Sequence, residues 1–271
     1  MSTAFCYVTD GRDDAEMRKW SMASLHRFCG DVPVFTCTAK NLYKTPFGGE
    51  RVIDISSAFG CAFGGVDPAK RCPGNSSFPA LVFGKFALPF VRELASFDTV
   101  VALDGDIEVV RPEFAGIMDV RLPVDADVGL VESRGSSTWM KPEIGERHPD
   151  LWFPKSTFHS AGLVVMRGNW RPCTYQRRLT RMIQVSMDRK FFLPEEYAAN
   201  MFLSICTLPP EYHVIPEMKE ANRGGLSGKD LDDAYALHYG GPRKKAVRER
   251  WKHQYETGGA VDVHNLAGVA K

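Results

Sequence analysis

Residues 99–112 have the sequence TVVALDGDIEVVRP, in which two aspartates interrupt the most hydrophobic run of this region. Burying a carboxylate is costly unless a partner compensates its charge. Asp104 and Asp106 therefore either follow the end of a strand and face water, or they bind a positively charged group. The apolar residues Val100–Leu103 predict a buried strand directly ahead of them.

The residues before this stretch predict the opening of an α/β sheet. Ser56–Pro79 is rich in glycine but lacks the spacing of a phosphate loop, so we expect a connecting loop, with a flap beside a site as the alternative. Strands are expected at Ala4–Val8, Val32–Cys37 and Arg51–Ile55, with a helix over Ala15–Phe28 between the first two.

Strands and helices continue to alternate along the rest of the chain. Directly before the opening stretch, Phe83–Ala95 has helical spacing with a kink expected at Pro89. The whole order predicts one α/β domain with a mixed, mostly parallel central sheet. Further strands are expected at Asp127–Val131, Phe158–Met166 and Tyr212–Ile215, helices at Thr174–Lys190 and from Leu193 to about Ile205, and a short apolar segment at Tyr235–Tyr239.

Composition excludes several classes of protein. The formal net charge of the 271 residues is +1, which gives no electrostatic reason to expect a nucleic-acid partner. No apolar run is long enough to predict a membrane-spanning helix, and the start MSTAFCYVTDGRDD lacks the pattern of a signal peptide. The seven cysteines include no C-x-x-C pair, which argues against a zinc site or disulfide framework and favours a reducing, cytoplasmic location.

The sequence contains two Asp-x-Asp pairs, and their positions relative to the strands differ. Ligands of open α/β sheets bind beyond the carboxyl ends of the strands. Asp104 and Asp106 follow their strand, whereas Asp125 and Asp127 precede theirs and are expected in a solvated loop. Gly105 removes a side chain between the first two acids and lets both face one ligand. Their oxygens suit Mg²⁺ or Mn²⁺, with a plain turn as the alternative.

A histidine far along the chain supports the interpretation as a metal site. His238 follows a short apolar run and precedes a glycine turn and several cations. A purely structural histidine is the alternative, but beside two carboxylates an imidazole is a candidate third ligand that would favour Mn²⁺. Lys244 could stabilise a phosphate as a point charge.

Four sequence blocks, in order, carry a resemblance to a known family. They are KFAL at 85–88 with VALDGD at 101–106, FHSAGL at 158–163, EEYAAN at 195–200, and HYGGPRK at 238–244. These resemble the basic helix and D-x-D strand, the F-N-A-G block, the D-Q-D-x-x-N block and the H-Y-x-G-P-x-K block of the retaining glycosyltransferases of family 8. That family includes lipopolysaccharide galactosyl- and glucosyltransferases and glycogenin. The resemblance covers roughly residues 4–250, and we expect one GT-A domain over residues 1–250 followed by a basic C-terminal tail over 251–271.

The resemblance implies a GT-A fold of Rossmann type, a nucleotide-sugar donor that is usually a UDP-sugar, and Mn²⁺ or Mg²⁺ as cofactor. Asp104, Asp106 and His238 would hold the metal. Gly241 and Lys244 would contact the diphosphate. The other donor contacts would come from strand ends and the basic helix, namely Thr9 and Asp10 near the nucleobase, Lys85 at the sugar or phosphate, Asp104 and Gly105, and Ala161 and Gly162 beside the sugar.

Glu195 and Glu196 are the candidate catalytic residues. Breaking a glycosyl–phosphate bond develops negative charge on the diphosphate, which a cation and Lys244 would stabilise. It also develops positive charge on the sugar, which a carboxylate would stabilise or attack. The alternative is that both are only acids of a first helical turn.

The chain departs from the family pattern in the blocks near the sugar. Ser160 stands where the family has asparagine, Glu196 where it has glutamine, and Tyr197 where it has the last aspartate of D-Q-D. Lys245 and Ala246 replace a Pro-Trp pair. A glutamate at 196 favours a covalent intermediate, with front-face attack as the alternative. These changes bear on the sugar and the acceptor more than on the fold or the metal.

Two further segments predict contacts with acceptor and membrane. Ser133–Thr157 holds three aromatics that could stack on sugars as an acceptor loop, with a packed surface loop as the alternative. The segment RKKAVRERWKHQY at 243–255 is basic with interleaved aromatics. It could lie on the anionic inner face of a membrane that presents a lipid-linked saccharide, or form a solvated helix face.

Two other classes of function stay open. One is a nucleotide-sugar-binding protein without turnover. The other is a nucleotidyltransferase, which would need a glycine-rich, lysine-containing loop after the first strand. The chain instead has the acidic stretch TDGRDD at residues 9–14.

Overall fold

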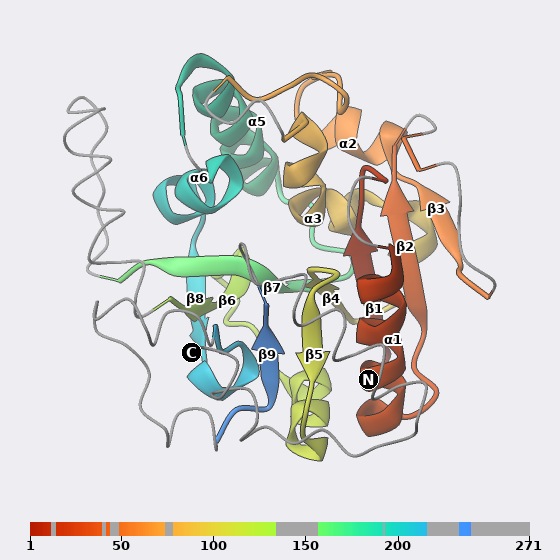
Figure 1. Ribbon diagram of the computed structural model, residues 1–271. Coiled ribbons are helices and arrows are strands. Elements are labelled where there is room, and N and C mark those ends of the chain that lie inside the picture. The colour runs from red at the N-terminus through yellow and green to blue at the C-terminus, as the bar shows by residue number, and fades with distance from the viewer. Residues whose placement is uncertain are drawn as a thin grey trace, which may run out of the picture.

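The computed structural model describes residues 1–11, 15–39, 42–43, 49–73, 78–133, 157–191, 193–215 and 233–239. Its central sheet has the strand order β3-β2-β1-β4-β7-β6-β8, and a smaller sheet pairs β5 with β9 (Figure 1). The strands are β1 (Thr3–Val8), β2 (Val34–Thr38), β3 (Val52–Asp54), β4 (Thr99–Leu103), β5 (Ile107–Val109), β6 (Val128–Glu132), β7 (His159–Arg167), β8 (Ile205–Leu208) and β9 (Ala236–His238).

The central sheet is mixed and mostly parallel, which confirms the predicted fold class. Strands β3, β2, β1 and β4 run parallel to one another, and β8 runs parallel to β6. Strand β7 lies between β4 and β6 and runs antiparallel to both. As a result, the beginning of β7 lies beside the carboxyl end of β4.

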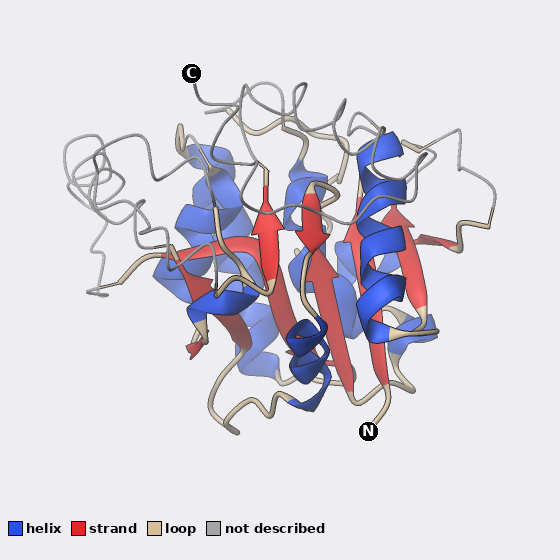
Figure 2. Ribbon diagram, turned by 60° about the horizontal axis from the view of Figure 1, so that its bottom comes forward, coloured by secondary structure: helices blue, strands red, loops and turns tan. Residues whose placement is uncertain are grey.

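Helices cover both faces of the sheet (Figures 1 and 2). The α-helices are α1 (Ala15–Cys29), α2 (Ser56–Ala62), α3 (Gly84–Ala87), α5 (Cys173–Asp188) and α6 (Pro194–Phe202). The 3₁₀ helices are η1 (Ala80–Phe83), η2 (Leu88–Phe90), η3 (Arg92–Leu94), η4 (Pro112–Asp119) and η5 (Pro210–Tyr212). None of these described helices is long and apolar enough to cross a membrane.

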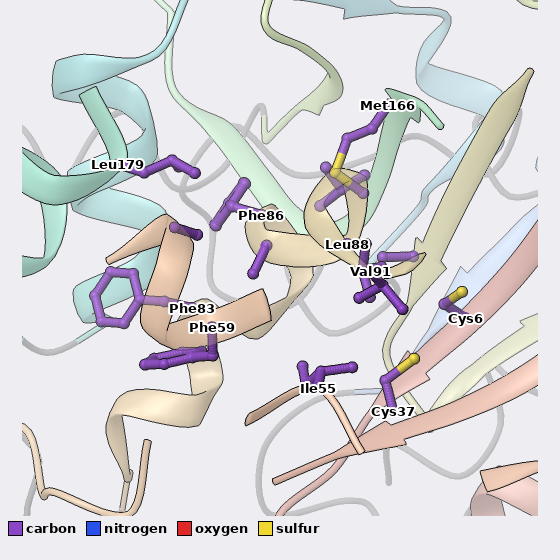
Figure 3. Packing of buried hydrophobic residues seen from close by; sticks show 14 of the residues in the cluster. Cys6, Cys37, Ile55, Phe59, Phe83, Phe86, Leu88, Val91, Met166 and Leu179 are labelled. Atoms are coloured by element: carbon purple, nitrogen blue, oxygen red, sulfur yellow. The ribbon is translucent and has the colours of Figure 1, made fainter. Parts of the chain in front are cut away.

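The strands supply side chains to two hydrophobic clusters, one on each face, because neighbouring residues of a strand point to opposite sides. In β1, Cys6 belongs to the cluster under α2, α3, α5 and α6, where Phe59, Phe83 and Leu179 also pack (Figure 3). Its neighbour Tyr7 belongs to the other cluster, together with apolar residues of α1, β5 and η4. Burial on both faces explains the continuous apolar runs of these strands.

Several elements differ from the sequence prediction. The expected loop at Ser56–Pro79 begins with α2, and the helix expected to reach Ile205 ends at Phe202. Ile205–Leu208 instead pairs with β6, so sheet pairing overrides the helical pattern there. The predicted strand at Tyr212–Ile215 is also wrong, because η5 ends at Tyr212 and Val214 makes a single bridge to Leu237.

The second Asp-x-Asp pair is solvated only in part. Asp125 is exposed, as expected. Asp127 is 4% exposed, forms an ion pair with Arg178 and accepts a hydrogen bond from the backbone N–H of Ser204 at 2.8 Å. The prediction for Asp127 was therefore wrong, because a cation and a backbone donor from distant parts of the chain compensate its buried charge.

Candidate active site

Four chain segments meet at one edge of the central sheet. Strand β4 ends at Leu103, directly before Asp104, and its antiparallel neighbour β7 pairs Leu163 with Leu103. The backbone N–H of Asp104 donates to the carbonyl of Gly162 at 2.9 Å. In the smaller sheet, His238 of β9 pairs with Ile107 of β5. Pairing of these strands thus brings the carboxylates, the Ala161–Gly162 block and His238 together, as the sequence predicted.

The side chains of Asp104, Asp106 and His238 form a cluster that could hold a metal ion. The backbone turns after β4, where the N–H of Ile107 donates to the carbonyl of Asp104 at 3.2 Å. One ligand atom from each of the three side chains lies within 4.8 Å of the others. Nε2 of His238 is 3.0 Å from Oδ1 of Asp106 and 3.8 Å from Oδ2 of Asp104. Two carboxylate oxygens and one imidazole nitrogen fit Mn²⁺, with other positions left to water and phosphate.

Lys85 places a buried positive charge against this cluster. Its Nζ lies 2.5 Å from Oδ1 of Asp104 and donates to the carbonyl of Ala161 at 2.8 Å. Burial alone would lower the pKa of Lys85, but Asp104 and Glu195 raise that pKa above its ordinary value. Lys85 therefore remains a cation. Asp104 directs one carboxylate oxygen to Lys85 and the other towards His238.

An irregularity in β7 connects the cluster to Glu196. The register of the β6–β7 pairing shifts between Leu130, opposite Val164, and Val131, opposite Ser160. The N–H of Ala161 lies within this shift and donates to Oε1 of Glu196 at 3.0 Å. Since the carbonyl of Ala161 accepts from Lys85, one residue of β7 contacts both side chains.

Glu196 belongs to helix α6, and hydrogen bonds from strand β7 fix its carboxylate. The hydroxyl of Ser160 donates to Oε1 of Glu196 at 2.8 Å, so the serine that departs from the family pattern has a defined partner. Burial raises the pKa of Glu196, and the hydrogen bonds from Ser160 and Ala161 act in the opposite direction. Asn200 fastens α6 to β7, because it accepts from the N–H of His159 at 2.9 Å and donates to the carbonyl of His159 at 2.7 Å.

Glu195 is the second buried carboxyl group of this region and is 8% exposed. Burial raises its pKa to about 8, although the charge of Lys85 acts to lower that pKa; Glu196 and Asp104 raise it further. Within the described part of the chain, its Oε2 has no hydrogen-bond partner. At neutral pH the group is therefore mostly a neutral acid that can donate one hydrogen bond.

The variant Glu195→Gln is expected to lose part of the pH dependence of stability. In the folded protein the pKa of Glu195 is about 8, whereas the ordinary pKa of a glutamate side chain is 4.5. Between these values the unfolded chain binds fewer protons, so this group makes the free energy of unfolding fall by about 1.4 kcal/mol for each unit of rising pH. Glutamine has no such proton, and the stabilisation of the variant over wild type should grow with pH.

Urea denaturation of wild type and Glu195→Gln across this pH window measures the effect. Glu93→Gln is the matched control, since Glu93 is exposed. A difference between wild type and Glu195→Gln that stays constant with pH would show that Glu195 ionises at its ordinary pKa.

Sequence reasoning missed His213, which lies directly against His238. Nε2 of His213 is 2.9 Å from Nδ1 of His238. A side chain at Gly162 would not fit, because its Cβ would lie 2.4 Å from Nε2 of His213 and 2.8 Å from Nδ1 of His238. The absence of a side chain at Gly162 thus makes room for two imidazoles, and its expected contact with a donor sugar stays a prediction.

The remaining candidate residues lie at the end of β1 or outside the described residues. Thr9 is 3% exposed, and its hydroxyl accepts a hydrogen bond from the N–H of Gly11 at 2.9 Å. This contact places Thr9 and Asp10 in a turn at the same sheet edge, where a contact with a nucleobase is still a prediction. Gly241, Lys244, the aromatics of the expected acceptor loop and the basic tail are outside the described residues.

The architecture is that of the GT-A glycosyltransferases. No protein-family model and no curated protein matches the chain. Solved structures do match, among them the galactosyltransferase LgtC in complex with donor and acceptor sugar analogues, with a TM-score of 0.63 and 15% identity over 95% of this chain and 96% of that one. The glycosyltransferase GlyE of Streptococcus pneumoniae TIGR4 has a TM-score of 0.57 and 13% identity, covering 97% of this chain and 62% of GlyE. Mouse xyloside xylosyltransferase 1 has a TM-score of 0.57 and 11% identity, covering 88% and 96%.

Proposed function

We propose that the protein is a metal-dependent retaining glycosyltransferase of family 8 that moves a sugar, a hexose in the simplest case, from a UDP-sugar to a glycan or lipid-linked saccharide. The observation that carries the proposal is the cluster of Asp104, Asp106 and His238 at the strand edge of a GT-A fold. The donor and acceptor analogues bound to LgtC support the same chemistry for a chain of this architecture.

In this proposal the three clustered side chains would hold Mn²⁺ or Mg²⁺, and the bound cation would supply positive charge to stabilise the leaving diphosphate. Lys85 adds a second fixed cation 2.5 Å from Asp104 and orients that carboxylate. A buried cation in a fixed position stabilises developing negative charge without reorganising at the moment of reaction. Lys244 and Gly241 would contact the same diphosphate.

Glu196 supplies the opposite charge on the sugar side. Its carboxylate is fixed by Ser160 and Ala161, so it can stabilise an oxocarbenium-like sugar or attack it from a constant position. Glu195, as a neutral acid, can donate a hydrogen bond to a donor hydroxyl. We place this activity in polysaccharide biosynthesis in the cytoplasm, with the basic segment 243–255 as a peripheral membrane contact.

A panel of nucleotide sugars incubated with the protein tests this function. With Mn²⁺ present, we expect slow release of UDP from one UDP-sugar, abolished by a chelator and restored by added Mn²⁺. Retention of the anomeric configuration in the sugar product would support the retaining class. Mn²⁺-dependent binding of UDP without release from any donor, even with saccharide acceptors added, would favour the nucleotide-sugar-binding protein. Absence of UDP binding would overturn the proposal, and pyrophosphate release from a nucleoside triphosphate would point to the nucleotidyltransferase.

A further inference from the structure

The pair formed by His213 and His238 extends the candidate metal cluster by one residue. Each nitrogen of His238 has its own neighbour: Nε2 faces the carboxylates of Asp106 and Asp104, and Nδ1 faces Nε2 of His213 at 2.9 Å. The two ring centroids are 4.9 Å apart and the rings are inclined by 50°. The contact between the rings is therefore a nitrogen–nitrogen hydrogen bond rather than a parallel stack.

Metal binding by His238 fixes which of its nitrogens carries the proton. Nε2 can donate its lone pair to a cation only when it is unprotonated, so the proton must be on Nδ1. A buried N–H needs an acceptor, and ligating histidines usually give this second N–H to a carboxylate, carbonyl or water. Among the described residues, Nε2 of His213 lies within hydrogen-bond reach of Nδ1, and it accepts when the proton of that ring is on its own Nδ1.

The backbone holds both rings in place. The N–H of Val214 donates to the carbonyl of Ala236 at 3.0 Å, and the N–H of His238 donates to the carbonyl of Val214 at 2.8 Å. The segment after η5 is thus fastened to β9 on both sides of Leu237, the residue directly before His238. Gly162 of β7 closes the other side, where any Cβ would collide with both imidazoles. His213 is 5% exposed, so water has little access to compete for the hydrogen bond.

We propose that His213 is a positioning residue for the metal site: its Nε2 accepts the Nδ1 proton of His238, which fixes the ring and the tautomer that present Nε2 to the cation. The inference deepens the proposed function and rests on it. It predicts that His213 affects metal affinity without contacting the metal or the sugar.

Four variants separate this role from a role in packing. His213→Leu fills the space but removes the acceptor, and His213→Gln restores an acceptor oxygen near the position of Nε2. Asp106→Ala removes a proposed ligand. Tyr212→Phe is the matched control, since Tyr212 packs edge-to-face against Phe114 and Tyr235 in the neighbouring cluster and takes no part in the metal site. Thermal denaturation shows that each variant is folded.

The first readout is the dissociation constant of Mn²⁺, measured on the full chain by the electron paramagnetic resonance of free Mn²⁺. We expect His213→Leu to weaken binding about 10–100-fold, the usual effect of removing the partner of a ligating histidine. His213→Gln should recover most of the affinity, and Tyr212→Phe should equal wild type. Folded His213→Leu with wild-type affinity would overturn the inference while Asp106→Ala, by losing affinity, still supported the metal site.

The second readout is the tautomer of His238, measured by nitrogen NMR of histidine-labelled protein loaded with diamagnetic Zn²⁺. We expect a proton on Nδ1 of His238 and a scalar coupling across the hydrogen bond to Nε2 of His213, both lost in His213→Leu. A proton on Nε2 in the loaded protein would overturn the inference. If wild type bound neither Mn²⁺ nor Zn²⁺, the proposed metal-dependent function would fail together with the inference, an outcome distinct from selective failure of the His213 variants.

Discussion

Replacing Asp106 with alanine is expected to lower sugar transfer about 10³-fold, comparable to the loss of a principal electrostatic group in an active site. Asp106 is 6% exposed, and its Oδ1 lies 3.0 Å from the proposed ligand nitrogen of His238. Asp104 cannot replace it, because one of its oxygens already pairs with Lys85. The variant would thus keep one carboxylate oxygen and one imidazole, and the loss of one of the three proposed ligands should weaken Mn²⁺ binding.

UDP release and Mn²⁺ affinity, measured together, check this expectation. Asp125→Ala is the matched control, since Asp125 belongs to the other Asp-x-Asp pair and is exposed. It should retain both activity and affinity. Unchanged Mn²⁺ affinity in Asp106→Ala would exclude the cluster as the metal site, whereas lost affinity with full activity would show a metal-independent transferase.

The variant Glu196→Gln is expected to lower kcat by a factor of about 10²–10⁴, the range typical of a positioned acid or base. Glutamine can accept the same hydrogen bonds from Ser160 and Ala161 through its amide oxygen, so the local structure should persist. What disappears is the negative charge that, in the proposed mechanism, would face the positively charged sugar of the transition state. Since burial already raises the pKa of Glu196, the uncharged variant should be at least as stable as wild type.

Steady-state kinetics with the donor found in the panel separate kcat from KM for Glu196→Gln. Glu195→Gln and Ser160→Ala serve as comparisons: the first removes the neighbouring acid, and the second removes one hydrogen bond but leaves the carboxylate. We expect the loss of kcat to be largest for Glu196→Gln. A larger loss in Glu195→Gln would assign the reacting carboxyl group to Glu195 instead.

The part of the site that follows strand ends could be predicted from the sequence. Asp104 and Asp106 come directly after a buried apolar strand, and a ligand of an α/β sheet binds at that edge. His238 follows a short apolar segment and begins the fourth sequence block, HYGGPRK at 238–244, which singled it out as a candidate. Both rules are local, and the structure does bring these three residues together.

Other features depend on contacts between distant residues, which no local pattern encodes. His213 meets His238 across 25 positions, and Asp127 meets Arg178 across 51. The sequence therefore predicted a strand at His213 and a solvated loop at Asp127. Strand β8 was missed for the same reason, since Ile205–Leu208 becomes a strand by pairing with β6.

The division of the chain into two sheets has a consequence for how the protein is made and inherited. Strand β9, which carries His238, belongs to the two-stranded sheet, whereas all seven strands of the central sheet come before it in the chain. When the ribosome has synthesised residues 1–210, all strands of the central sheet are present, but His238, the third proposed metal ligand, is not. Frameshifts and premature stops after β8 would then give chains that keep the strands of the main sheet and both aspartates but lack His238, so the proposed metal site would be incomplete in them.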